Sequence, residues 1–103
     1  MSSQEAFITV LKASVATAIE HKQAALSLIE RTKTPSTKSA LVAAQAAAYR
    51  AQKAITVFEE ALTFPQATTR ATDITEAGLV HLDMCERHLN RVSDLLFRME
   101  GTE

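Results

Sequence analysis

The scarcity of helix-breaking residues is the feature that most constrains this chain. Two prolines and two glycines occur in 103 residues. Both prolines fall in short polar stretches, Pro35 at 32–36 and Pro65 at 64–73. Because proline lacks the N–H that a helix interior needs, we expect the chain to break at these stretches. The segments between them are predicted to be three helices, and their expected ranges are about 4–32, 36–63 and 74–100.

Each predicted helix carries an apolar stripe with steps of three and four residues. The first stripe comprises Ile8, Leu11, Val15, Ala18, Ala25 and Ile29. The second comprises Leu41, Ala44, Ala48, Ala51, Ile55, Phe58 and Leu62. The third comprises Leu82, Cys85, Leu89, Val92, Leu96 and Met99. This heptad-like spacing, with alanine at many positions, predicts an all-α fold. We expect residues 1–103 to form one domain, an up-down-up antiparallel three-helix bundle with coiled-coil-like, alanine-rich packing.

Residues at the predicted helix ends agree with these boundaries. Pro35 suits the first turn of the second helix, with Thr34 as its N-cap. Asp73 followed by Glu76 is close to a capping box and predicts the start of the third helix. Gly101 follows the last apolar position, where a C-terminal glycine cap is common.

Charge and cysteine content exclude several classes of protein. Eleven Lys and Arg against twelve Asp and Glu give a net charge of -1, which argues against nucleic-acid binding. Charged residues interrupt every long apolar run, so no signal peptide and no membrane span are expected. Cys85 is the single cysteine and has no internal partner for a disulfide. We therefore expect a cytoplasmic protein.

The sequence contains no motif of a known catalytic or cofactor-binding site. A phosphate-binding loop needs more glycines than this chain has, and no nucleophile elbow or paired-cysteine motif is present. We therefore expect no enzymatic activity and no cofactor.

A cluster of metal-binding residue types gives the main alternative. His81, Cys85 and His88 follow one another at i, i+4 and i+7, on one side of the third predicted helix. In a parallel arrangement of the first and third helices, His21 lies near the level of His88. These four residues predict a metal- or small-ligand-binding bundle, whereas buried packing of the thiol is the simpler interpretation. A histidine phosphocarrier, based on His81 in the segment 80–83, is a less favoured alternative.

Apolar side chains on otherwise polar helix faces are the better indication of function. Seven residues form these candidate contact faces. The third helix contributes Val80, Arg87, Arg91, Phe97 and Arg98, and the second contributes Val42 and Tyr49. Exposed aromatic residues beside arginines are typical anchors of protein interfaces. The favoured hypothesis is a non-enzymatic interaction module, such as an adaptor, accessory, chaperone-like or inhibitor protein. It would bind a protein partner, or a second copy of itself in a homo-oligomer, through an amphipathic helix face.

Overall fold

The computed structural model describes residues 3–63 and 69–101. These residues form a three-helix bundle, and the described part of the chain contains no strand. Its elements are α1 (Ser3–Arg31), the short 3₁₀ helix η1 (Pro35–Thr37), α2 (Lys38–Ala61) and α3 (Thr69–Gly101). The predicted fold class is confirmed, and the first two helices end within two residues of the predicted positions.

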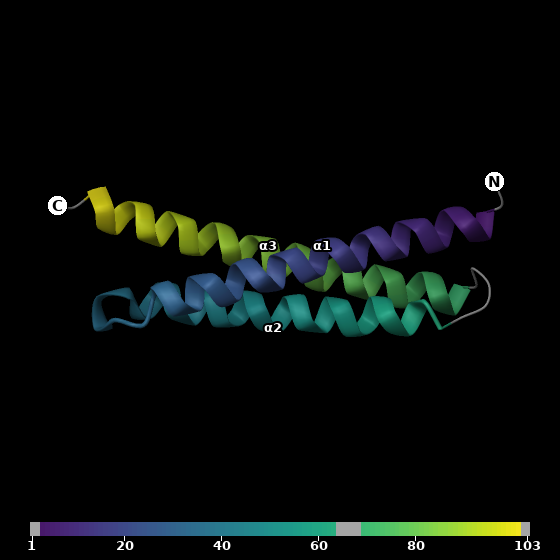
Figure 1. Ribbon diagram of the computed structural model, residues 1–103, viewed down its shortest axis with the longest axis horizontal. Coiled ribbons are helices and arrows are strands. Elements are labelled where there is room, and N and C mark those ends of the chain that lie inside the picture. Colours follow the sequence, from purple (N-terminus) through teal and green to yellow (C-terminus); the bar gives the residue numbers. More distant parts are fainter. Residues whose placement is uncertain (1–2, 64–68, 102–103) are drawn as a thin grey trace.

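The three helices lie along a rod that measures 56 × 20 × 18 Å. α2 runs antiparallel to both α1 and α3, so the chain termini lie at opposite ends of the rod (Figure 1). α2 is the central helix, because it contacts α1 and α3 along most of its length, whereas α1 and α3 contact each other little. In the view of Figure 1, α1 and α3 cross each other above α2, and each lies away from the other two helices at one end.

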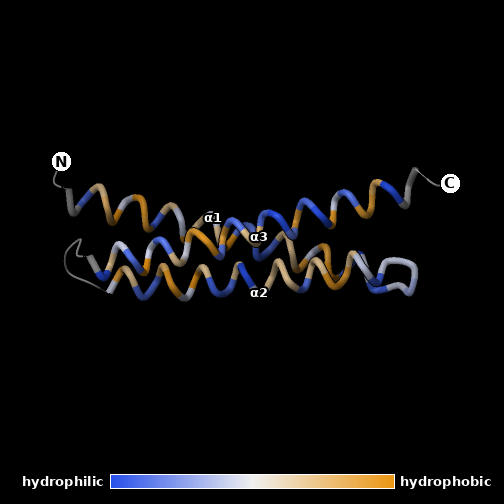
Figure 2. Tube along the Cα trace, turned by 180° about the vertical axis from the view of Figure 1, so that it is seen from behind, coloured by the Kyte–Doolittle hydropathy of each residue, from blue (hydrophilic) through white to orange (hydrophobic). Residues whose placement is uncertain are grey.

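The core is a narrow line of small side chains along α2. Among the described residues, ten of the sixteen buried apolar side chains are alanines. Three clusters follow the rod, around Phe58, around Cys85 and around Val92. Apolar and polar residues alternate along each helix, as an amphipathic bundle requires (Figure 2). The accessible surface is 6635 Å², whereas a compact monomer of this mass exposes about 5,700 Å². The elongated shape therefore leaves more surface in water than a compact domain does.

A second apolar stripe on α2 was missed by the sequence prediction. Of the predicted seam, Leu41 and Ala48 are only half-buried. The fully buried positions also include Ala47, Ala54 and Ala61, which the prediction did not place in the core. α2 lies between two helices and needs an apolar face wide enough for both. The prediction followed the bulkier residues and overlooked a contact made almost entirely by alanine.

The predicted start of α3 was wrong. α3 begins at Thr69, so Asp73 lies inside the helix and is not its N-cap. No proline or glycine interrupts 69–73, and Ala71 is fully buried, so the first turn packs against the core. The remainder of the expected linker, 64–68, lies outside the described residues. Gly101 is the last residue of α3, whereas the prediction placed it as a cap just after the helix.

The connection between α1 and α2 is a tightly bonded turn. Thr34 and Pro35 occupy the N-cap and first position of η1, whereas they were predicted for α2, whose N-cap is Thr37. The Thr34 N–H donates to Thr37 Oγ1 at 3.2 Å. Thr37 Oγ1 lies 2.8 Å from the Thr32 carbonyl, to which it donates. The buried Thr32 hydroxyl donates to the Leu28 carbonyl at 2.7 Å. These bonds fix the short turn that makes α1 and α2 antiparallel neighbours.

Polar contacts also join α1 to the other helices. Lys22 Nζ donates to Gln52 Oε1 of α2 at 2.7 Å. His21 Nε2 lies 3.3 Å from Glu86 Oε1 of α3. Within residues 3–63 and 69–101, no helix has a stretch long and apolar enough to cross a membrane.

Candidate functional site

The four residues proposed as metal ligands are held in different surroundings. His21 is half-buried at the contact between α1 and α3. Its Nδ1 donates to the Thr17 carbonyl at 2.9 Å, in the same helix. Its Nε2 faces the Glu86 carboxylate and forms an ion pair when the ring is protonated. His21 therefore joins α1 to α3 through Nε2, while Nδ1 is bonded within α1.

His81 pairs with an arginine of α2. Its Nδ1 lies 3.0 Å from Arg50 Nη1. Burial lowers the pKa of His81, and the positive charges of Arg50 and Lys53 lower it further. The ring is therefore neutral at neutral pH, and Nδ1 accepts a hydrogen bond from the guanidinium. Because Nδ1 accepts this hydrogen bond, its lone pair is not free to take a phosphoryl group or to bind a metal ion.

Cys85 is a core residue. Its side chain is fully buried and packs beside Ala25, Ala47 and Ala51. Burial raises the pKa of the Cys85 thiol to about 11, with a further contribution from the negative charge of Glu86. A protonated, buried thiol is a poor nucleophile and a poor metal ligand.

The remaining candidate, His88, lies in a different groove. The helix spacing does place His81, Cys85 and His88 on one side of α3. All three face α2, but His81 is bonded to Arg50, Cys85 is enclosed by core alanines, and His88 lines the pocket at the start of α2. Among the residues that the structure describes, no group of three or more His, Cys, Asp or Glu is arranged to hold a metal ion. The geometry thus gives the metal hypothesis no support.

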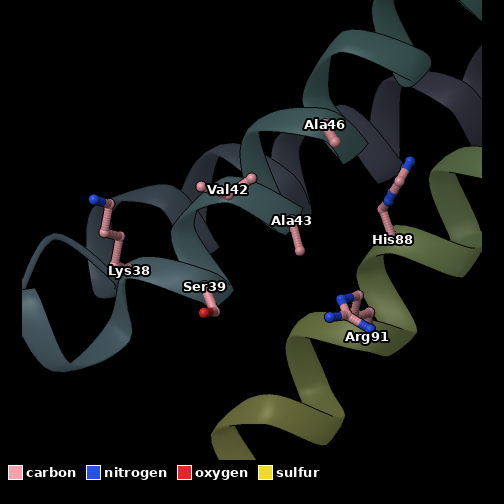
Figure 3. A pocket seen from close by; sticks show the side chains of 7 residues that line it. All are labelled: Lys38, Ser39, Val42, Ala43, Ala46, His88 and Arg91. Carbon is pink, nitrogen blue, oxygen red and sulfur yellow. The ribbon is translucent and has the colours of Figure 1, made fainter.

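A pocket of about 390 Å³ opens between the start of α2 and the second half of α3. Its lining residues come from both helices: Lys38, Ser39, Val42, Ala43, Ala46, His88 and Arg91. The short side chains Ser39, Ala43 and Ala46 point toward α3 and leave the space open (Figure 3). Lys38 stands at the end of the pocket, with its ammonium directed away from α3 (Figure 3). No acidic side chain lines the pocket, so it is apolar at its floor and basic at its edge.

The pocket brings together two residues that the sequence analysis assigned to separate helix faces, Val42 and Arg91. The sequence contains a spacing of small residues that indicates this pocket, although the pocket was not predicted. Ser39, Ala43 and Ala46 follow one another at i, i+4 and i+7, so one side of α2 is lined by small residues. Small side chains opposite an arginine and a histidine leave a gap that larger residues would fill.

The predicted apolar anchors are exposed. Phe97 is 74% exposed, Val80 and Tyr49 are each 58% exposed, and Val42 is 57% exposed. Tyr49 has two cations near its ring, with Lys53 Nζ at 5.5 Å and Arg50 Cζ at 5.9 Å from the centroid. Such contacts hold the ring in place while its outer face stays in water. Lys53 was not among the predicted site residues.

The three predicted arginines of α3 differ in their contacts. Arg87 Nε lies 3.0 Å from Asp83 Oδ2, in an exposed pair within the helix. Arg91 lines the pocket, and Arg98 is exposed in the last turn of α3. Further large apolar residues are exposed that were not among the predicted anchors: Val10, Ile19 and Leu26 on α1, and Leu79 on α3.

Comparison with known proteins gives no relative. No family model matches the chain, and neither a curated protein nor a solved structure matches it. The functional argument therefore depends on the chain's own side chains.

Proposed function

We propose that this protein is a non-enzymatic protein–protein interaction module that uses the outer faces of α2 and α3. The observation that carries the proposal is the exposure of four large apolar side chains on these two faces. They are Val42 and Tyr49 on α2, and Val80 and Phe97 on α3. The pocket beside Val42 gives a partner side chain a place to insert.

Burial of these side chains supplies the binding energy in this proposal. Covering apolar surface yields about 25 cal/mol for each Å², so full burial of one aromatic side chain contributes roughly 2–3 kcal/mol. Phe97 lies in the same helix as Arg91 and Arg98, and the Tyr49 ring lies within 6 Å of Arg50 and Lys53. Aromatic residues bordered by basic groups fit a partner with an apolar centre and acidic residues around it.

The contacts of the titratable groups support a non-enzymatic role. His21 is engaged by Thr17 and Glu86, His81 is engaged by Arg50, and Cys85 is enclosed in the core. A catalytic site needs a nucleophile, a base and an orienting group that converge on a space for substrate. The buried free thiol of Cys85 also supports our proposal of a cytoplasmic location, where thiols stay reduced.

The test is to add charge to the proposed contact faces without disturbing the fold. Phe97→Asp and Tyr49→Asp each remove an exposed anchor, and Asn90→Asp adds the same charge on α3 without removing apolar surface. We expect the first two variants to weaken self-association or binding of an isolated partner by tenfold or more, measured by sedimentation. The control variant should bind as the parent does, and circular dichroism should show unchanged helicity for all three. Equal binding by all variants would contradict the proposal.

A further inference from the structure

We propose that the outer face of α2 pairs with the same face of a second copy of this chain, antiparallel and centred on Tyr49. This inference rests on the proposed function, since it names the partner of one of the two faces. The face comprises Lys38, Val42, Tyr49, Thr56 and Glu60, all of which are exposed.

The spacing of these five residues places them on one line along α2. Val42 and Thr56 lie seven residues on either side of Tyr49, which is close to two helical turns. Lys38 and Glu60 lie eleven residues on either side, which is close to three turns. With 3.6 residues per turn, all four point within about 20° of the direction of Tyr49.

A two-fold axis through Tyr49 makes this line complementary to itself. In an antiparallel pair, residues at equal distances on opposite sides of Tyr49 face each other across the axis. Lys38 of one copy then faces Glu60 of the other, and this pairing occurs twice. Val42 faces the methyl group of Thr56, and the two Tyr49 rings meet at the centre. Charge is thus balanced at both ends, with the apolar contacts between them.

Both charged residues are available for such a contact. The ion pairs found among the described residues join His21 to Glu86, Lys33 to Glu30, and Arg87 to Asp83, so none of them uses Lys38 or Glu60. The Lys38 ammonium is also directed away from α3 (Figure 3).

The outer face of α3 is less suited to self-pairing. Its Asp83 and Arg87 already neutralise each other at 3.0 Å, and they would have to be stripped of water in a close helix contact. Between Lys38 and Glu60, Val42, Tyr49 and Thr56 carry no charge, and the nearest cation is Lys53, which lies about 40° to one side with its Nζ 5.5 Å from the centroid of the Tyr49 ring. In the antiparallel pair, Lys53 of one copy faces the uncharged Gln45 of the other. Exposed ion pairs contribute little affinity, so Lys38 and Glu60 set the register while Tyr49 and Val42 supply the attraction.

A charge exchange tests the register directly. The dissociation constant of the dimer is measured by sedimentation equilibrium for the parent, Lys38→Glu, Glu60→Lys and the double variant. We expect each single variant to weaken the dimer about tenfold, because both ends of the interface then carry like charges. The double variant should return to within about twofold of the parent, because the pairs are restored with their signs reversed.

A neighbouring residue provides the matched control. Glu59 is also exposed, but it lies one residue away around the helix and points off the proposed line. Glu59→Lys makes the same charge change as Glu60→Lys and should leave the dissociation constant unchanged. Circular dichroism checks that every variant keeps its helices.

Three results would overturn this inference. The first is a parent protein that stays monomeric up to millimolar concentration, and the second is a double variant that is no tighter than the single variants. The third is an equal effect of Glu59→Lys and Glu60→Lys. None of them overturns the proposed function, which fails only if Phe97→Asp and Tyr49→Asp leave every association unchanged.

Discussion

The ring of Phe58 occupies the space where Gly78 lacks a side chain. A Cβ atom added to Gly78 would lie 2.5 Å from Phe58 Cε1, far closer than packed carbon atoms approach. Phe58 is itself fully buried and is the largest side chain of the core. This contact lets α2 and α3 approach closely at the end of the rod where α3 begins.

We therefore expect Gly78→Ala to destabilise the protein, although alanine is the better helix former. The helix interior gains about 1 kcal/mol from the substitution, whereas forcing extra volume into a packed core costs about 1–3 kcal/mol. The net loss should appear as a lower midpoint in urea unfolding followed by circular dichroism. In a Phe58→Leu background, Gly78→Ala should become neutral or stabilising. A stabilised Gly78→Ala protein with Phe58 intact would contradict the close contact.

The contact between His81 and Arg50 predicts a pH dependence of stability. Folding lowers the pKa of His81 below its ordinary value of 6.5, through burial and through the positive charges of Arg50 and Lys53. Between the lowered pKa and 6.5 the unfolded chain binds more protons than the folded chain. The stability contribution of neutral His81 is thus present above pH 6.5 and is lost as the pH falls through the lowered pKa.

Denaturant unfolding at a series of pH values measures this effect. His81→Gln should flatten the fall in unfolding free energy below pH 6.5, because the titrating group is removed. If His81→Gln and the parent have the same slope, His81 does not titrate as described.

The buried thiol of Cys85 should react slowly with thiol reagents. Its side chain is enclosed and its pKa is raised to about 11, so thiolate is scarce at neutral pH. We expect modification by a disulfide reagent at pH 7.5 to be at least a hundredfold slower in the native protein than in urea. A native rate equal to the unfolded rate would show that Cys85 is accessible.

Adjacent alanines of α2 should respond differently to enlargement. Ala47 is fully buried, whereas Ala46 borders the pocket. Ala47→Leu is expected to destabilise the protein by about 1–3 kcal/mol through overpacking. Ala46→Leu has open space beside it and should change the unfolding free energy by less than about 0.5 kcal/mol. Equal losses for the two variants would contradict the presence of the pocket.

The sequence predicted those parts of the fold that depend on local pattern. The turn at Thr34 and Pro35 and the seam from Leu82 to Val92 follow from capping and from periodicity, which neighbouring residues determine. The parts that it missed depend on the identity of the facing helix. Ala47 and Ala54 differ from exposed alanines only in what packs against them, and Gly78 is required only because Phe58 lies opposite.

The candidate site also has residues that the sequence predicted correctly and contacts that it did not predict. Phe97 and Tyr49 were predicted as exposed residues because their positions in the helical repeat place them opposite the apolar stripe, and both are exposed. The histidines were grouped by spacing alone, and spacing along one helix does not show that Arg50 engages His81 or that Glu86 engages His21.

Native mass spectrometry of the untagged protein, as purified from cells, tests the interaction account most directly. The account predicts a species of twice the 11.2 kDa chain mass, without added metal, whose abundance grows with concentration. A species of one chain mass that retains one metal ion at every concentration would contradict it. Such a result would favour metal binding over protein–protein interaction as the function.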